Sequence, residues 1–179
     1  MTYKKPQPSP RFTYNIVLIG FMGTGKSTLA KYLSKTFSME IIEMDELIAQ
    51  REKMSIPDIF SIHGEGYFRN LETNLLKEMQ TKQNKIISCG GGAALRAENV
   101  IEMKKNGKVV LLTASPETIL ERVKHDNSRP ILKGRKNVEG ISELIEQRRE
   151  KYEAAADIII STDHKNIRQI CDELTDLLP

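Results

Sequence analysis

The sequence predicts an α/β fold in three layers, with a five-stranded parallel sheet that carries helices on both faces. Five short, unbroken apolar runs occupy residues 16–19, 41–42, 86–87, 109–112 and 158–160. Unbroken runs are typical of strands buried on both faces. The stretches between them space their apolar residues as helices do, and strands that alternate with helices favour parallel pairing with right-handed crossovers.

Two of the predicted helices have clear sequence signals. The first follows a glycine-rich stretch and places Leu29, Leu33 and Phe37 at helical spacing. Another is expected to begin at Ser115 and Pro116, because serine suits the position before a helix and proline suits its first turn. An amphipathic helix over residues 167–178 closes the chain, and no internal repeat is found.

Length and composition indicate one domain. With 179 residues, of which 39% are hydrophobic, the chain can bury one sizeable core, and we expect a single domain over residues 14–179. Residues 1–13 contain two lysines and three prolines and are predicted to form a disordered tail. No apolar run reaches 18 residues and no secretory signal is found, so we expect neither a membrane partner nor export.

Charge and cysteine usage narrow the function classes further. The net charge is +3, but the 27 basic and 24 acidic residues are interspersed, which favours an anionic small molecule over nucleic acid. Cys89 and Cys171 match no zinc or redox spacing, and a cytoplasmic location is expected. A monomer is the default expectation for the oligomeric state.

Residues 20–27, Gly-Phe-Met-Gly-Thr-Gly-Lys-Ser, match the phosphate-binding P-loop pattern G-x-x-x-x-G-K-[ST]. The glycines let backbone N–H groups approach phosphates, and the following helix directs its positive end at the same anion. Lys26 would neutralise the β and γ phosphates of ATP, and the Ser27 hydroxyl would bind Mg²⁺. The predicted ATP-binding residues of this loop are Gly23, Thr24, Gly25, Lys26, Ser27 and Thr28.

Further short motifs follow in chain order. They are the acids around Asp45, F-R-x-x-E at 68–72, the glycines at 90–92, Arg129-Pro130, and Arg148 with Tyr152. In this order, together with the phosphate loop, the sequence resembles the shikimate kinases over about residues 15–160. The resemblance implies a P-loop kinase fold with a substrate-binding region at about 44–80 and a mobile lid at about 125–140. It also implies Mg²⁺-dependent transfer of phosphate from ATP to shikimate, giving shikimate 3-phosphate for aromatic amino acid biosynthesis.

The resemblance assigns the acceptor side of the site. Arg69 and Arg148 match the arginines that hold the shikimate carboxylate, for which a guanidinium fork is well shaped. Asp45 matches the acid that orients the reacting hydroxyl and accepts its proton. Gly91 and Gly92 match backbone that contacts the substrate.

The resemblance also assigns two arginines on the ATP side. Arg129, in the predicted lid, would reach the transferring phosphate, as lid closure excludes water. Arg122 would lie beside the adenine, with residues 162–165 on its other side. The other basic lid residues are expected to be solvated, because residues 125–140 offer few apolar anchors.

Structural alternatives stay open for several of these residues. Arg69 could instead pair with Glu65 or Glu72 on a helix surface, and Asp45 could be an acid that stabilises a helix N-terminus. Glu43 stands where many family members have a magnesium-associated Asp, so it is not assigned to the metal. Arg149 adjoins Arg148, which leaves the register of the second arginine open.

Two other functions are open as well. Gluconate kinases and nucleoside monophosphate kinases share the phosphate loop and lid, although Asp45, Arg69 and the three glycines fit the shikimate pattern better. A nucleotide-binding switch would need an N-K-x-D type guanine contact, and residues 84–85 lack the required aspartate after them.

Overall fold

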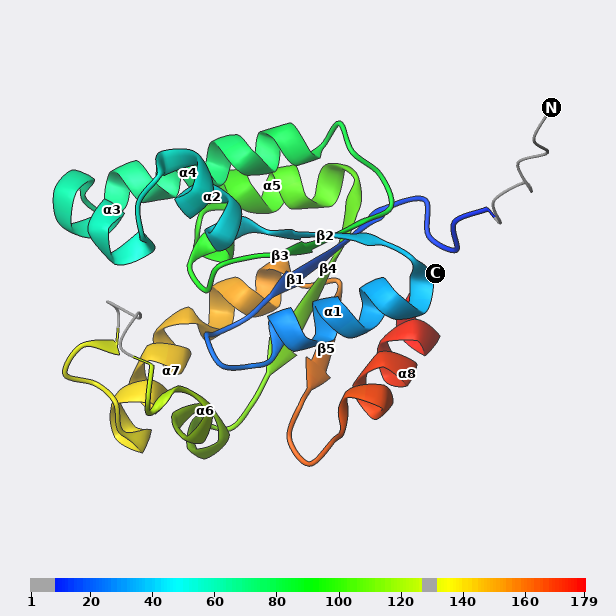
Figure 1. Cartoon of the computed structure of the whole chain (residues 1–179). Helices are drawn as coiled ribbons and strands as arrows, with labels where there is room; N and C mark the ends of the chain where they lie inside the picture. Colours follow the sequence, from blue (N-terminus) through cyan, green and yellow to red (C-terminus); the bar gives the residue numbers. More distant parts are fainter. Residues whose placement is uncertain (1–8, 127–131) are drawn as a thin grey trace.

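The computed structural model describes residues 9–126 and 132–179, and it shows the predicted α/β architecture. All five strands pair in parallel in the order β2-β3-β1-β4-β5 (Figure 1). The strands are β1 (Asn15–Ile19), β2 (Glu40–Glu43), β3 (Lys85–Ser88), β4 (Gly107–Thr113) and β5 (Ile158–Ser161). The five predicted apolar runs are therefore all confirmed as strands.

Helices follow the strands as the sequence pattern indicated. Their bounds are α1 (Lys26–Phe37), α2 (Met44–Glu52), α3 (Ile56–His63), α4 (Glu65–Met79), the short 3₁₀ helix η1 (Ala93–Leu95), α5 (Ala97–Lys105), α6 (Pro116–Val123), α7 (Val138–Ala155) and α8 (Ile167–Leu177). Within the described residues, no helix is both long enough and apolar enough to span a bilayer.

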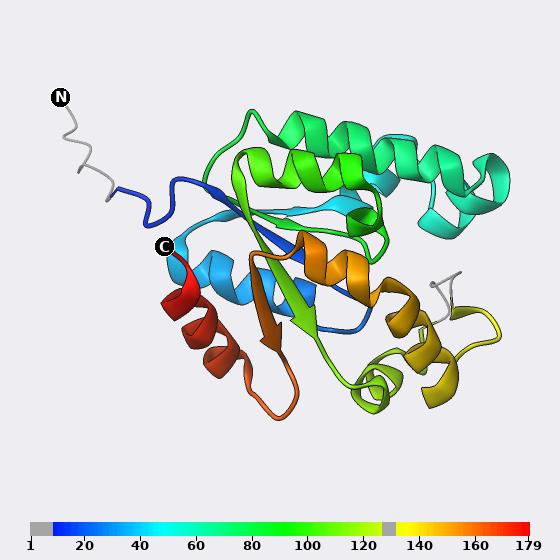
Figure 2. The same ribbon diagram turned by 180° about the vertical axis from the view of Figure 1, so that it is seen from behind.

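The sheet separates two apolar clusters, because successive side chains of a strand point to opposite faces. Ile16 and Leu18 of β1 pack with α1 and α8, which lie side by side on one face (Figures 1 and 2). Val17 and Ile19 pack into the other cluster, with residues of α4, α5 and α7. Both faces of the central strand are thus buried, which is why it reads as an unbroken apolar run.

The carboxyl ends of the strands bring the distant motifs to one edge. The phosphate loop follows β1, α2 follows β2, and the three glycines follow β3, which pairs with both β1 and β2. In open parallel sheets ligands bind at this edge. The topology therefore places the predicted nucleotide and acceptor residues beside one another.

Gly20, the first residue of the phosphate loop, has a packing reason to be glycine. Its φ is +143°, and a Cβ there would lie 2.4 Å from the carbonyl oxygen of Leu112 on β4. Because that neighbour is backbone, it has no rotamer with which to move aside. The chain can leave β1 in this direction only without a side chain at residue 20.

The predicted start of α6 is confirmed in its details. The Ser115 side chain accepts a hydrogen bond of 3.2 Å from the Thr118 backbone N–H, and Pro116 occupies the first turn. Asp163, which follows β5, accepts from the Ser115 N–H at 3.0 Å and so ties this turn to the next strand end. Helix α8 begins with a complete capping box formed by Asn166 and Gln169.

The boundary predicted for the N-terminal tail is wrong at its inner end. Phe12 is only 2% exposed and packs edge-on against Phe37 of α1, while Arg11 stacks over both rings. The sequence analysis placed Phe12 in the tail because the prolines and lysines before it are typical of a disordered segment. Residues 1–8 lie outside the described residues, so that part of the prediction remains a prediction.

The predicted lid contains an anchor that the sequence analysis missed. Leu132 is completely buried in the same cluster as Ile141 and Leu144 of α7. Helix α7 begins inside the predicted lid, with the Asn137 side chain accepting from the Gly140 N–H at 2.6 Å. Residues 127–131, including Arg129, lie outside the described residues.

Candidate active site

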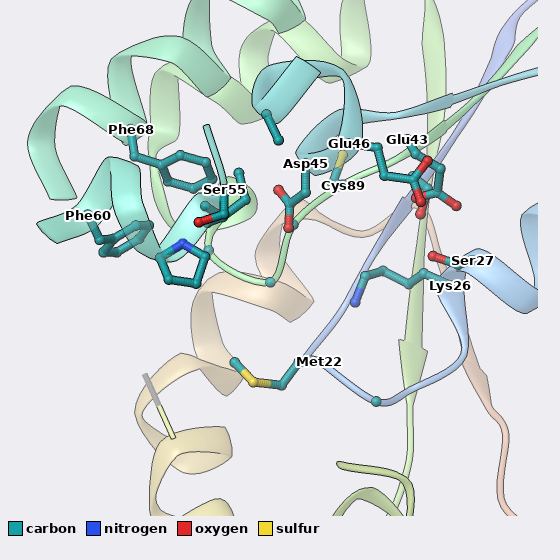
Figure 3. A pocket seen from close by; sticks show the side chains of 18 of the residues that line it. Met22, Lys26, Ser27, Glu43, Asp45, Glu46, Ser55, Phe60, Phe68 and Cys89 are labelled. Carbon is teal, nitrogen blue, oxygen red and sulfur yellow. The ribbon is translucent and has the colours of Figure 1, made fainter. Parts of the chain in front are cut away.

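A cavity of about 620 Å³ opens at the carboxyl edge of the sheet and joins the two predicted halves of the site. Helices α2, α3 and α4 form one side of it, and the phosphate loop and the glycine turn after β3 form the other (Figure 3). The predicted site residues that line it are Gly23, Gly25, Lys26, Ser27, Thr28, Asp45, Arg69, Gly91, Gly92 and Arg148.

The phosphate loop turns into α1 through Gly25, whose φ of 100° is left-handed. The Lys26 ammonium arches back over the loop and donates hydrogen bonds to the carbonyls of Gly20 at 2.8 Å and Phe21 at 3.0 Å. Ser27 and Thr28 line the cavity at the start of the helix. The loop therefore presents a positive helix end, a cation and a hydroxyl to the same space.

Thr24 has a different part in the same loop. It is buried and does not line the cavity, and its hydroxyl donates a 2.8 Å hydrogen bond to the Phe21 carbonyl. This bond closes the turn from within. The side chain thus shapes the loop, whereas the prediction placed Thr24 among the ATP-binding residues without distinguishing backbone from side chain.

Arg69 combines the two arrangements that the sequence left open. It pairs with Glu72 at 2.7 Å and with Glu65 at 3.1 Å, yet its guanidinium also lines the cavity. Its side chain is 13% exposed and lies over the rings of Phe60 and Phe68. Arg69 is thus held by two acids on its own helix and also lines the cavity.

Arg148 is a nearly buried cation, at 8% exposed. It donates long hydrogen bonds to the Tyr152 hydroxyl at 3.3 Å and the Gly91 carbonyl at 3.4 Å, and lies over the Phe21 ring. Among the described residues, no carboxylate lies within ion-pair distance of it. Arg149 is exposed and pairs with Glu146, so the structure places Arg148, not Arg149, at the cavity.

The glycine turn is shaped by the side chains that surround it. A Cβ at Gly90 would lie 2.7 Å from Asp45 Oδ1, and one at Gly92 would lie 2.4 Å from the Arg69 guanidinium nitrogens. A Cβ at Gly91 would make only ordinary contacts, from 3.5 Å outward. Two of the three glycines therefore make room for the chain's own polar side chains, a reason that the sequence analysis did not find.

Glu72 is the buried acid that this arrangement adds. Its side chain is inaccessible to solvent, and its second oxygen, Oε2, has no hydrogen-bond partner among the described residues. The pKa of Glu72 is raised to about 7, chiefly by burial and in smaller part by the charge of Asp45, while the Arg69 and Arg96 cations oppose the shift. Burial likewise raises the pKa of the Cys89 thiol, which makes that cavity residue chemically inert.

Comparison with known proteins gives the family. The shikimate kinase family model matches residues 22–179. The chain belongs to the shikimate kinase family. It is 42% identical over 160 residues to the shikimate kinase of Sulfurihydrogenibium sp., covering 89% of this chain and 95% of that one. It is 43% identical over 160 residues to the shikimate kinase of Persephonella marina, covering 89% and 96%.

A solved member of the family has the same fold. The structure described as shikimate kinase from Acinetobacter baumannii in complex with shikimate superposes with a TM-score of 0.87 at 31% identity, covering 92% of each chain. The sequence resemblance and the predicted three-layer kinase fold are both confirmed by these matches.

Two predicted arginines of this shikimate kinase family member remain, Arg122 and Arg129, and only Arg122 lies among the described residues. Arg122 does not line the cavity. Its guanidinium donates to the Gly23 carbonyl at 2.9 Å, and it approaches the Thr162 hydroxyl at 3.5 Å. It therefore links α6 and the end of β5 to the phosphate loop. Arg129 falls among the residues that the structure leaves undescribed, so its assignment stays a prediction.

Sequence reasoning assigned no site role to Tyr152, and it considered Glu72 only as an alternative ion-pair partner of Arg69. Both residues were in motifs that supported the resemblance. Glu72 follows Arg69 by three residues and Tyr152 follows Arg148 by four, which are the spacings that bring side chains together on a helix. That spacing was the available signal, since each residue contacts the arginine one turn before it.

Proposed function

We infer that the protein catalyses the ATP-dependent phosphorylation of shikimate to shikimate 3-phosphate. One observation carries the site assignment: Arg148 is nearly buried, has no carboxylate partner among the described residues, and lines the same cavity as the phosphate loop. A buried cation is costly unless an anion accompanies it. A carboxylated acceptor supplies that anion, and family membership supports shikimate as the acceptor.

The residues of the cavity divide the work. Arg148 and Arg69 would hold the carboxylate of shikimate and so direct the ring into the space between the helices and the glycine turn. Asp45, at the start of α2, would orient the reacting hydroxyl and accept its proton as the oxygen attacks the γ phosphate. Lys26 would neutralise part of the charge on the phosphates, and the N–H groups of Gly23 and Gly25 would stabilise it by hydrogen bonds.

The donors at the nucleotide end fit a magnesium ion. Ser27 offers a hydroxyl, and Glu43 has a buried carboxylate oxygen, Oε1, without a hydrogen-bond partner among the described residues. Figure 3 shows Glu43 and Glu46 at the same end of the cavity as Ser27. Within the described residues, no three His, Cys, Asp or Glu side chains form a group that could hold a metal by themselves. When bound, Mg²⁺ would neutralise phosphate charge during transfer.

The proposal includes four further assignments. Arg129 would stabilise the transferring phosphate from a lid at residues 125–140. Arg122 would lie beside the adenine, which its contact with Gly23 supports. A cytoplasmic location is supported by two free, buried cysteines. The enzyme is proposed to act as a monomer.

The acceptor is tested by ADP release from purified protein given ATP and Mg²⁺ with shikimate, gluconate, AMP or CMP in separate reactions. We expect turnover with shikimate and background rates with the others, because Asp45, Arg69 and the three glycines fit the shikimate pattern better than the patterns of the other kinases. Turnover with gluconate or a nucleoside monophosphate, and none with shikimate, would overturn the proposal.

A further inference from the structure

The buried hydroxyl of Tyr152 lies where two functional groups meet. It donates a hydrogen bond to the Gly91 carbonyl and accepts one from Arg148, whose guanidinium also reaches that carbonyl at 3.4 Å. Tyr152 is 4% exposed and does not line the cavity. It therefore touches both an arginine and a turn of the proposed acceptor site without itself reaching the ligand.

The phenol is suited to hold this arrangement. Burial raises the pKa of Tyr152, although the nearby Arg148 cation opposes the shift, so the hydroxyl keeps its proton to donate to Gly91. A guanidinium can only donate hydrogen bonds, whereas a hydroxyl can both donate and accept. Tyr152 thus joins two groups, a cation and a carbonyl oxygen, and fixes the angle at which they meet.

The other end of the glycine turn is fastened to the helix that carries Arg69. Asn99 is completely buried, and its side-chain amide donates to the Ala93 carbonyl at 2.8 Å. Its oxygen lies 2.6 Å from the hydroxyl of Thr73, which follows Arg69 by one turn of α4. The turn is therefore held from both sides, and the Gly91 carbonyl gives Tyr152 a fixed point against which to set Arg148.

We propose that Tyr152 is a positioning residue that sets the direction of the Arg148 guanidinium, and with it the affinity for the acceptor carboxylate. The proposal rests on the assignment of Arg148 to that carboxylate. The Arg148 guanidinium makes only two hydrogen bonds to the described residues, and both are long. Its direction therefore depends on each of them. Without the hydroxyl, the ring of Tyr152 would still fill its place in the core, but the Arg148 guanidinium would keep only its 3.4 Å bond to Gly91 and its contact with the Phe21 ring.

The test is Tyr152→Phe, which removes one oxygen and keeps the ring. We expect the KM for shikimate to rise about tenfold, the effect of losing one hydrogen bond to a charged group. The KM for ATP and kcat should stay within about twofold, because the phosphate loop and Asp45 are untouched. Calorimetric titration with shikimate gives the affinity independently of turnover.

Tyr14→Phe is the matched control. Tyr14 also donates its hydroxyl to a backbone carbonyl, that of Pro179 at 2.8 Å, but it lies on the opposite side of the sheet with the α1 and α8 cluster. Both substitutions remove one such bond, so a small fall in Tm is expected from each. Only Tyr152→Phe should change shikimate affinity, and equal affinities in the two variants would overturn the proposal.

A double variant separates positioning from general weakening. If Tyr152 acts through Arg148, then Tyr152→Phe should raise KM no further when Arg148 is already alanine. Fully multiplicative effects would show that Tyr152 acts by another route and would refute the inference. If Arg148→Ala alone leaves the KM for shikimate unchanged, the carboxylate assignment itself fails. That outcome differs from an impaired Arg148→Ala beside an unaffected Tyr152→Phe, which would overturn only the positioning role.

Discussion

Replacing Arg148 by methionine should separate stability from function. Methionine keeps much of the length and apolar stem but removes a charge that is 8% exposed and has no carboxylate partner among the described residues. The substitution abolishes two hydrogen bonds of 3.3 and 3.4 Å and the stacking of the guanidinium over Phe21. Exchanging a buried charge for an apolar group of similar volume is often neutral or stabilising.

The loss of affinity for shikimate should be much larger than the change in stability. Truncating one partner of a buried, hydrogen-bonded charge pair costs about 2–5 kcal/mol of binding free energy. For Arg148→Met this predicts a KM for shikimate raised by at least about 30-fold. The Tm of the free enzyme should be unchanged or higher, at about 2–4 °C for each kcal/mol gained in a chain of this size.

Arg149→Met is the internal control, measured by the same steady-state assay and thermal melts. Arg149 is exposed and pairs with Glu146 one turn earlier, and such surface pairs contribute about 0–1 kcal/mol. Its KM for shikimate should equal that of the wild type. The reasoning is refuted if the two variants have the same KM, or if Arg148→Met melts several degrees below the wild type.

Three further predictions follow from the same cavity. Gly92→Ala should raise the KM for shikimate, because the new methyl would displace the flexible Arg69 guanidinium 2.4 Å away. The control is Gly66→Ala, which has open space around it and should leave the KM unchanged. Equal KM values in the two variants would contradict the packing argument. The pKa of Glu72 is 4.5 in the unfolded chain and about 7 in the folded protein, so its contribution to stability is complete below pH 4.5 and is lost as pH rises through 7. Glu72→Gln should flatten that part of the profile of unfolding free energy against pH, measured by urea denaturation, and an unchanged slope would count against the shift. Asp45→Asn should lower kcat by about 10²-fold or more with little change in Tm, and a kcat near that of the wild type would remove Asp45 from proton transfer.

The layout of the sheet could be predicted because its signal is local and repeated. A strand buried on both faces must be apolar at every position, and the runs in β1, β3 and β4 are buried in this way. The edge strands β2 and β5 are partly exposed but carry the same kind of apolar run. The phosphate loop could be predicted because each of its residue types has a mechanical requirement. Neither prediction depends on contacts between segments that are far apart in the sequence.

What the sequence did not reveal depends on contacts between distant segments. Phe12 was assigned to a tail because the prolines and lysines that precede it in the sequence are typical of a disordered segment. Its packing partner, Phe37, lies in a later helix, and the sequence does not show that contact. Leu132 was missed for the same reason, because its neighbours on α7 come later in the chain. The glycine turn was found, but the side chains that require Gly90 and Gly92 come from α2 and α4.

Gly20 changes what a match to the phosphate-loop pattern can mean. A side chain at residue 20 is excluded by a carbonyl of the neighbouring strand and not by a nucleotide. Selection for folding alone would therefore retain this glycine. A descendant that had lost catalysis would keep this first glycine, and a search that weighted it heavily would still accept such a pseudoenzyme. The lysine and serine that close the pattern are the informative positions for telling active from inactive descendants.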